Sequence, residues 1–152
     1  MGILIIVLMV VAGVSLAVQA PINAAFAKKA GALESALISF FIGAVFLLIV
    51  VIFFGKFDPV AFSAVPKWQL LCALCGLTYV VLSILAVPKI GVGIVMISVI
   101  VGQIVTGIII DHFGLFGNAI IAIDGQRMIG IVLLLASLYF MLGNKAAAKQ
   151  PA

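Results

Sequence analysis

Residues 90–110 contain no charged side chain, and most of them are Ile, Val or Gly. An α-helix rises about 1.5 Å per residue, so a helix of this length spans roughly the 30 Å hydrocarbon core of a bilayer. The whole chain has 152 residues, of which 67% are hydrophobic and 8% are charged. Soluble domains have about 45–50% apolar and about 25% charged residues, so we predict an all-α integral membrane protein.

Four other apolar runs have a similar length, which predicts five transmembrane helices in a single transmembrane domain, residues 1–152. The expected spans are residues 3–27, 34–54, 68–87, 90–110 and 126–142. The first run resembles a signal peptide, but no Lys or Arg precedes it and Pro21 follows the only plausible cleavage sequence. We therefore expect it to remain as a membrane helix that Pro21 kinks.

Residues that stop or cap helices set the expected boundaries. A turn is predicted around Lys28, Lys29, Gly31 and Glu34, and a loop over residues 55–67. Pro88-Lys89 is expected to end the third helix and to begin a tight turn into the fourth. Gly114 is expected to cap the end of the fourth helix, Asp124 the start of the fifth and Gly143 its end, before a frayed polar tail.

Uncharged polar residues interrupt the predicted spans at helical spacing. Ser15, Gln19 and Asn23 fall on one face of the first helix, because residues four apart are neighbours on a helix. The other candidates are Tyr79 and Ser83 on the third helix and Ser98, Gln103 and Thr106 on the fourth. Polar groups facing lipid are unfavourable, so these side chains should face the protein interior. They are candidates to bind a small polar or zwitterionic solute; the alternative is that they only hydrogen-bond helices together.

Small residues recur every four positions on the second helix, at Ser35, Ser39 and Gly43, and predict a close helix contact. Cys72 and Cys75 are too few for a structural zinc site and are expected to be small buried helix residues.

The sequence has no catalytic constellation, no nucleotide-binding glycine loop and no basic cluster. We therefore expect neither an enzyme nor a nucleic-acid-binding protein, and no metal or cofactor. The adjacent Asp111 and His112 allow two interpretations, a proton-linked gate or a solvated helix end.

Five spans would place the two termini on opposite membrane faces. One face would hold Lys56, Lys67 and Arg127, and the other Lys28, Lys29, Lys89, Lys145 and Lys149. Without the tail lysines the two faces are equal. This distribution leans toward a cytoplasmic C-terminus or permits insertion in both orientations.

Several local motifs resemble those of one family. They are Gln19-Ala-Pro-Ile-Asn23, Ser39-Phe-Phe-Ile-Gly43, Tyr79-Val-Val-Leu-Ser83 with Val87-Pro-Lys-Ile-Gly91, Gly102-Gln103, Asp111-His-Phe-Gly-Leu-Phe-Gly117 and Arg127-Met-Ile-Gly130. With these motifs the chain resembles the half-size YdcZ-type branch of the drug/metabolite transporter (DMT) superfamily, over nearly its whole length.

The resemblance implies a multi-pass transporter of the bacterial inner membrane. Full-length members of the superfamily have ten helices in two inverted repeats, so a five-helix half would pair antiparallel with itself or with a paralogue. Solute would then pass by alternating access through a cavity between the halves, near the membrane midplane. Related small multidrug resistance proteins use a glutamate in the first helix, where this chain has Ser15, Gln19 and Asn23. That difference argues against cation–proton exchange by their mechanism. The alternative function is a non-transporting membrane scaffold or an accessory subunit.

Overall fold

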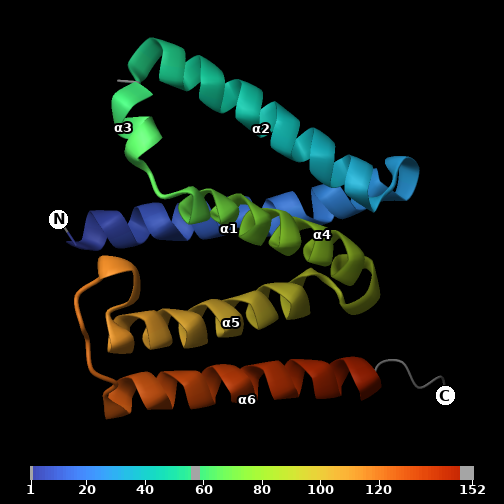
Figure 1. Cartoon of the computed structure of the whole chain (residues 1–152). Coiled ribbons are helices and arrows are strands. Elements are labelled where there is room, and N and C mark those ends of the chain that lie inside the picture. Colours follow the sequence, from blue (N-terminus) through green and yellow to red (C-terminus); the bar gives the residue numbers. More distant parts are fainter. Residues whose placement is uncertain (1, 56–58, 148–152) are drawn as a thin grey trace. The chain divides into compact units, whose positions relative to one another are not determined.

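A computed structural model describes residues 2–55 and 59–147 of the chain. The described residues form α-helices and short 3-10 turns and contain no β-strand (Figure 1). Five of the described helical segments are long and apolar enough to cross a membrane. The predicted all-α membrane fold with five spans is therefore confirmed. The chain divides between Lys89 and Ile90 into two compact units.

The first unit contains the first three membrane-spanning segments. Its elements are α1 (Gly2–Ala30), α2 (Ala32–Phe54), α3 (Pro59–Ala64), the 3-10 turn η1 (Lys67–Leu71) and α4 (Cys72–Ile90). The short helix α3 lies where a loop was expected, and Pro59 occupies its first position, where the missing N–H costs nothing. Lys56 and Asp58, which were expected to stop the flanking helices, lie outside the described residues.

Gly31 is the only non-helical residue between α1 and α2. Its φ of 103° lies in a region that glycine enters without steric cost, so the chain changes direction within one residue. The wider turn predicted around Lys28 and Lys29 is wrong, because both lysines belong to the last turn of α1. Pro21 lies inside α1, which continues through it.

The prediction that Pro88 ends the third span is also wrong. Pro88 lies inside α4, and the helix continues to Ile90. Proline removes one backbone donor, and near the end of a helix that loss affects a single hydrogen bond. Gly91, with a φ of 85°, then separates α4 from the next helix, so the predicted five-residue turn is reduced to one residue.

The buried part of the first unit lies near the α1–α2 turn and against α4. It consists of Ala20, Asn23, Ala24, Ser35, Ala36, Val80, Ser83, Ile84 and Val87. Most of these residues on α1 and α2 are small, which lets the two backbones approach closely. Apart from the half-buried Leu16, the large apolar side chains of both helices are exposed, as expected for surfaces that face lipid.

The second unit is built from α5 (Val92–Phe113), the 3-10 turn η2 (Leu115–Gly117) and α6 (Gly125–Ala147). Helices α5 and α6 lie side by side (Figure 1).

Two predicted helix caps are confirmed in this unit. Gly114 ends α5 in the left-handed conformation, with φ 58° and ψ 34°, and Oδ1 of Asp124 accepts a 2.7 Å hydrogen bond from the backbone N–H of Arg127. The predicted cap at Gly143 is wrong, because α6 continues to Ala147.

Candidate solute-binding site

Asn23 is the buried polar residue at the contact between α1 and α2, and it is 7% exposed. The Ser35 hydroxyl donates a 2.9 Å hydrogen bond to the backbone carbonyl of Asn23. The Ser39 hydroxyl donates a 2.7 Å hydrogen bond to Oδ1 of the Asn23 side chain. Ser35 and Ser39 lie one turn apart on α2 and so share a face. Together they fix both the backbone and the amide of Asn23.

A narrow cleft lies beside Asn23, between α1 and α4. It is lined by Gln19, Ala20, Asn23, Tyr79, Val80, Ser83 and Ile84. The gaps between its walls are too narrow to hold a water molecule. None of the described lining residues is charged, so the cleft offers neutral hydrogen-bonding groups within an apolar wall.

The Tyr79 hydroxyl is buried in this region, and within the described part of the chain it has no hydrogen-bond partner. Its side chain packs against the apolar cluster formed by Ala36, Val80 and Ile84. A buried hydroxyl without a partner costs about 1–3 kcal/mol of desolvation free energy, and most such groups in proteins are satisfied. The Tyr79 hydroxyl can therefore hydrogen-bond a partner that the described residues do not supply.

The structure brings together four of the residues predicted to bind solute: Gln19, Asn23, Tyr79 and Ser83. Their role in binding stays a prediction. Ser15 is not among the lining residues; it is exposed, and its hydroxyl donates to the Val11 carbonyl of its own helix at 3.1 Å.

The candidates on α5 belong to the second unit. Gln103 and Thr106 are exposed, and the Ser98 hydroxyl donates to the Ile94 carbonyl at 2.8 Å. The role of Ser98, Gln103 and Thr106 in binding solute stays a prediction.

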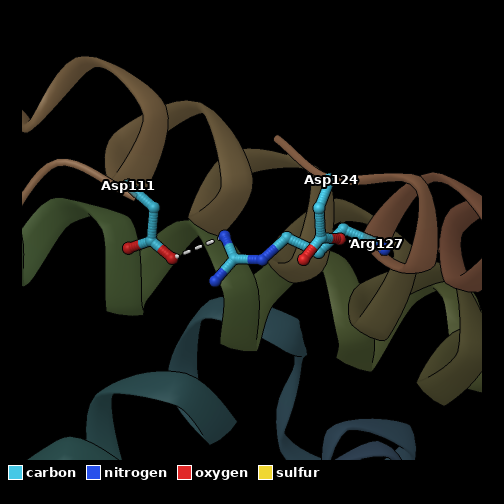
Figure 2. A network of polar contacts seen from close by, with 3 residues as sticks. All are labelled: Asp111, Asp124 and Arg127. Carbon is cyan, nitrogen blue, oxygen red and sulfur yellow. Dashed lines mark hydrogen bonds and ion pairs between the residues drawn. The ribbon is translucent and has the colours of Figure 1, made fainter. Parts of the chain in front are cut away.

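A second polar site joins the ends of α5 and α6, as Figure 2 shows. Arg127 Nη1 lies 3.1 Å from Oδ2 of Asp111, and the two side chains are 29% and 36% exposed respectively. The Asp111 carbonyl also accepts a 2.9 Å hydrogen bond from the N–H of Ile121. Asp111 thus contacts both α6, through Arg127, and the segment that connects α5 to α6, through Ile121. Its neighbour His112 is exposed. The role of Asp111 and His112 as a gate stays a prediction.

Two of these interactions were not predicted from the sequence. Ser35 and Ser39 were interpreted as spacers for close packing, although serines one turn apart can also donate hydrogen bonds to a neighbouring helix. The Asp111–Arg127 pair was missed because Asp111 was considered together with His112. Opposite charges at the adjoining ends of consecutive predicted helices are the signal that would have found it.

Cys72 and Cys75 are exposed, so the prediction that they are buried is wrong. No group of three or more His, Cys, Asp or Glu side chains that could hold a metal ion occurs in the described residues.

Comparison with known proteins gives one family match. The model of the DMT_YdcZ family, described as "Putative inner membrane exporter, YdcZ", matches residues 4–140. No curated protein matches the chain, and no solved structure does.

Proposed function

Because the chain belongs to the DMT-type YdcZ family of inner membrane exporters, we propose that it moves a small polar or zwitterionic solute through the cleft between α1 and α4. The family match and the five long apolar helices agree on a multi-pass membrane protein. The match also favours a transporter over an enzyme.

The observation that carries this proposal is the buried Tyr79 hydroxyl, which has no hydrogen-bond partner among the described residues and lies beside a cleft of uncharged polar groups. A protein that only holds helices together gains stability when each buried polar group hydrogen-bonds a neighbour. It gains no stability from a buried polar group without a hydrogen-bond partner. A solute-binding site benefits from such a group, because an arriving solute can form the missing hydrogen bond. The Asn23 amide, held by Ser39, supplies a second polar group from α1, in the opposite wall of the cleft.

Alternating access would require this closed cleft to open on each side of the membrane in turn. Pro21 follows Ala20, one of the lining residues, and lies two positions before Asn23. Proline has no N–H to donate to the carbonyl four residues earlier, so a helix bends most easily there. Bending of α1 at Pro21 is the movement that we propose opens the cleft.

We also propose that two copies, or this chain and a paralogue, pair antiparallel. Gln103 and Thr106 are exposed on the apolar helix α5, where polar groups in contact with lipid would be unfavourable. A second chain would cover them. The nearly equal distribution of Lys and Arg over the two predicted faces supports insertion in both orientations.

Efflux from proteoliposomes tests the transport proposal. Vesicles are loaded with a defined mixture of amino acids, sugars, polyols and nucleosides, and the solutes that leave are quantified by mass spectrometry. We expect at least one solute to leave faster than from protein-free vesicles, and Asn23→Ala to slow that efflux. Ser15→Ala is the matched control, because Ser15 lies on the same helix outside the cleft. No efflux, or efflux insensitive to Asn23→Ala, would favour a scaffold or accessory subunit.

Cysteine labelling tests the pairing. In a background with Cys72 and Cys75 replaced by serine, Lys29→Cys is labelled with a membrane-impermeant thiol reagent in intact and then in permeabilised vesicles. Vesicle reconstitution can randomise orientation, so the labelling is done on inner-membrane vesicles of the producing cells. We expect a comparable share of copies to react on each side. Labelling on one side only, together with a monomer in lipid, would contradict the antiparallel pair.

A further inference from the structure

The cleft combines fixed hydrogen-bond donors with a lining free of charge among the described residues. We infer that Ser39 positions the Asn23 amide so that the cleft selects uncharged solutes carrying a hydrogen-bond acceptor, such as an amide carbonyl or an alcohol oxygen, over ammonium compounds. This inference rests on the proposed function, because it names the class of solute that the same cleft would accept.

The first step is the orientation of the Asn23 side chain. A primary amide has one acceptor atom, Oδ1, and one donor group, the Nδ2 amine. Oδ1 already accepts the hydrogen bond from the Ser39 hydroxyl at 2.7 Å. The Ser35 hydroxyl holds the backbone of the same residue. Ser39 occupies one of the two Oδ1 lone pairs and Ser35 holds the backbone, so the orientation of the amide is set and its Nδ2 group can donate to a solute.

The second step is the Tyr79 hydroxyl, which lies in the opposite wall of the cleft and has no hydrogen-bond partner among the described residues. A phenol hydroxyl donates readily to a carbonyl or alcohol oxygen. Two donors from different helices, Asn23 on α1 and Tyr79 on α4, are therefore available to one solute oxygen or to two neighbouring ones.

The third step concerns charge. An ammonium group entering the cleft would lose its hydration shell, and no described lining residue offers a carboxylate in exchange. Glu34 lies at the start of α2, with its carboxylate beside Gly31, and is not among the lining residues. Burying an unpaired charge is far less favourable than burying a neutral polar group. Carboxylate-bearing solutes, zwitterions included, meet the same obstacle because the described lining has no Lys or Arg. The inference therefore narrows the proposed solute class to its uncharged polar members.

Fluorine NMR of the two tyrosines provides a direct readout. The chain has two tyrosines, Tyr79 and Tyr139, and Tyr139 is exposed on α6. Protein labelled with 3-fluorotyrosine in lipid nanodiscs is titrated with two matched pairs of solutes. These are nicotinamide against 1-methylnicotinamide, and glycerol against 3-aminopropane-1,2-diol. The variant Tyr139→Phe assigns the two resonances.

In at least one of the two pairs, we expect the neutral solute to shift the Tyr79 resonance and to leave the Tyr139 resonance in place. The cationic solute of the same pair should shift neither resonance. Ser39→Ala should weaken binding of that neutral solute about tenfold, the effect of losing one well-placed hydrogen bond, and reduce its advantage over the cation. Ser39→Thr, which keeps the hydroxyl, should restore both. Ser15→Ala should change neither, so a general loss of structure is separated from a loss of orientation.

Three results would overturn the inference. The first is a cation that shifts the Tyr79 resonance as strongly as its neutral partner, and the second is no shift with any of the four solutes. The third is an unchanged selectivity in Ser39→Ala. Each of these results leaves transport itself standing if efflux from vesicles still depends on Asn23. Failure of the proposed function is distinct, because that efflux is then absent or independent of Asn23.

Discussion

The Ser39 hydroxyl donates a 2.7 Å hydrogen bond to Oδ1 of Asn23 and so joins the middle of α2 to α1. Both residues lie within helices that are long and apolar enough to cross a membrane. The bond has two consequences. It stabilises the contact between α1 and α2, and it orients the Asn23 amide so that its Nδ2 group can donate to a solute in the cleft.

The first prediction is that Ser39 and Asn23 are energetically coupled. Ser39→Ala and Asn23→Ala should each destabilise the protein, and the double variant should lose less than the sum. Interhelical hydrogen bonds in membranes have coupling energies of about 0.6 kcal/mol and up to about 1.7 kcal/mol. Unfolding of the four proteins in mixed detergent micelles measures this energy. A coupling energy of zero would show that the bond contributes nothing to stability.

The second prediction separates stability from function at Tyr79. Tyr79→Phe removes a hydroxyl that has no hydrogen-bond partner in the described part of the chain, so the free energy of unfolding should stay the same or rise by up to about 1 kcal/mol. Solute efflux should nevertheless fall, because the solute loses its donor. Tyr139→Phe, on the exposed face of α6, is the control and should leave efflux unchanged. If Tyr79→Phe destabilises the protein, its hydroxyl has a partner in the folded state.

The third prediction concerns the one-residue turn at Gly31. Gly31→Ala should destabilise the protein by about 1–2 kcal/mol, because an L-residue disfavours a φ of 103° and its Cβ would meet the Glu34 carboxylate. Adding Glu34→Ala to Gly31→Ala removes the carboxylate that the new Cβ would meet. The double variant should therefore recover only the part of the lost stability that comes from this steric clash. Gly43→Ala is the control: Gly43 has open space around it and lies inside α2, so alanine should be neutral or stabilising. Thermal unfolding in lipid compares the variants, and equal effects at both glycines would contradict the prediction.

The fourth prediction concerns the ion pair that joins α5 to α6. Asp111 and Arg127 are each about one third exposed, so solvent screening limits their coupling to about 0.2–1 kcal/mol. A double-mutant cycle with Asp111→Asn and Arg127→Gln should give a value in this range that falls as salt is added. A larger, salt-independent coupling would show that lipid or a partner chain covers the pair.

The apolar runs predicted the fold because only helices can satisfy the backbone polar groups in lipid. The same rule explains why helix ends were predicted less well. Pro88 and Gly143 would stop many helices in water, but here α4 and α6 continue past them. In α4 the proline falls in the last turn, where few backbone hydrogen bonds remain to be lost.

The candidate site was predicted in part. The spacing of Gln19 and Asn23 placed both on one face of α1, and the same reasoning paired Tyr79 with Ser83. Periodicity within one helix does not reveal which groups on another helix lie opposite. Only the arrangement of α1, α2 and α4 in space therefore shows the hydrogen bond from Ser39 to Asn23. The same is true of the Tyr79 hydroxyl, which has no hydrogen-bond partner among the described residues.

Accessibility of the cleft to water tests the central claim most directly. Ser83 is 4% exposed and lines the cleft, whereas Ala36 is 1% exposed and belongs to the packed apolar cluster beside it. Each is replaced by cysteine in a background with Cys72 and Cys75 changed to serine, and both proteins are exposed in vesicles to a membrane-impermeant thiol reagent. If the cleft opens during transport, Ser83→Cys reacts and Ala36→Cys does not. Equal protection of the two cysteines would contradict a solute pathway between α1 and α4.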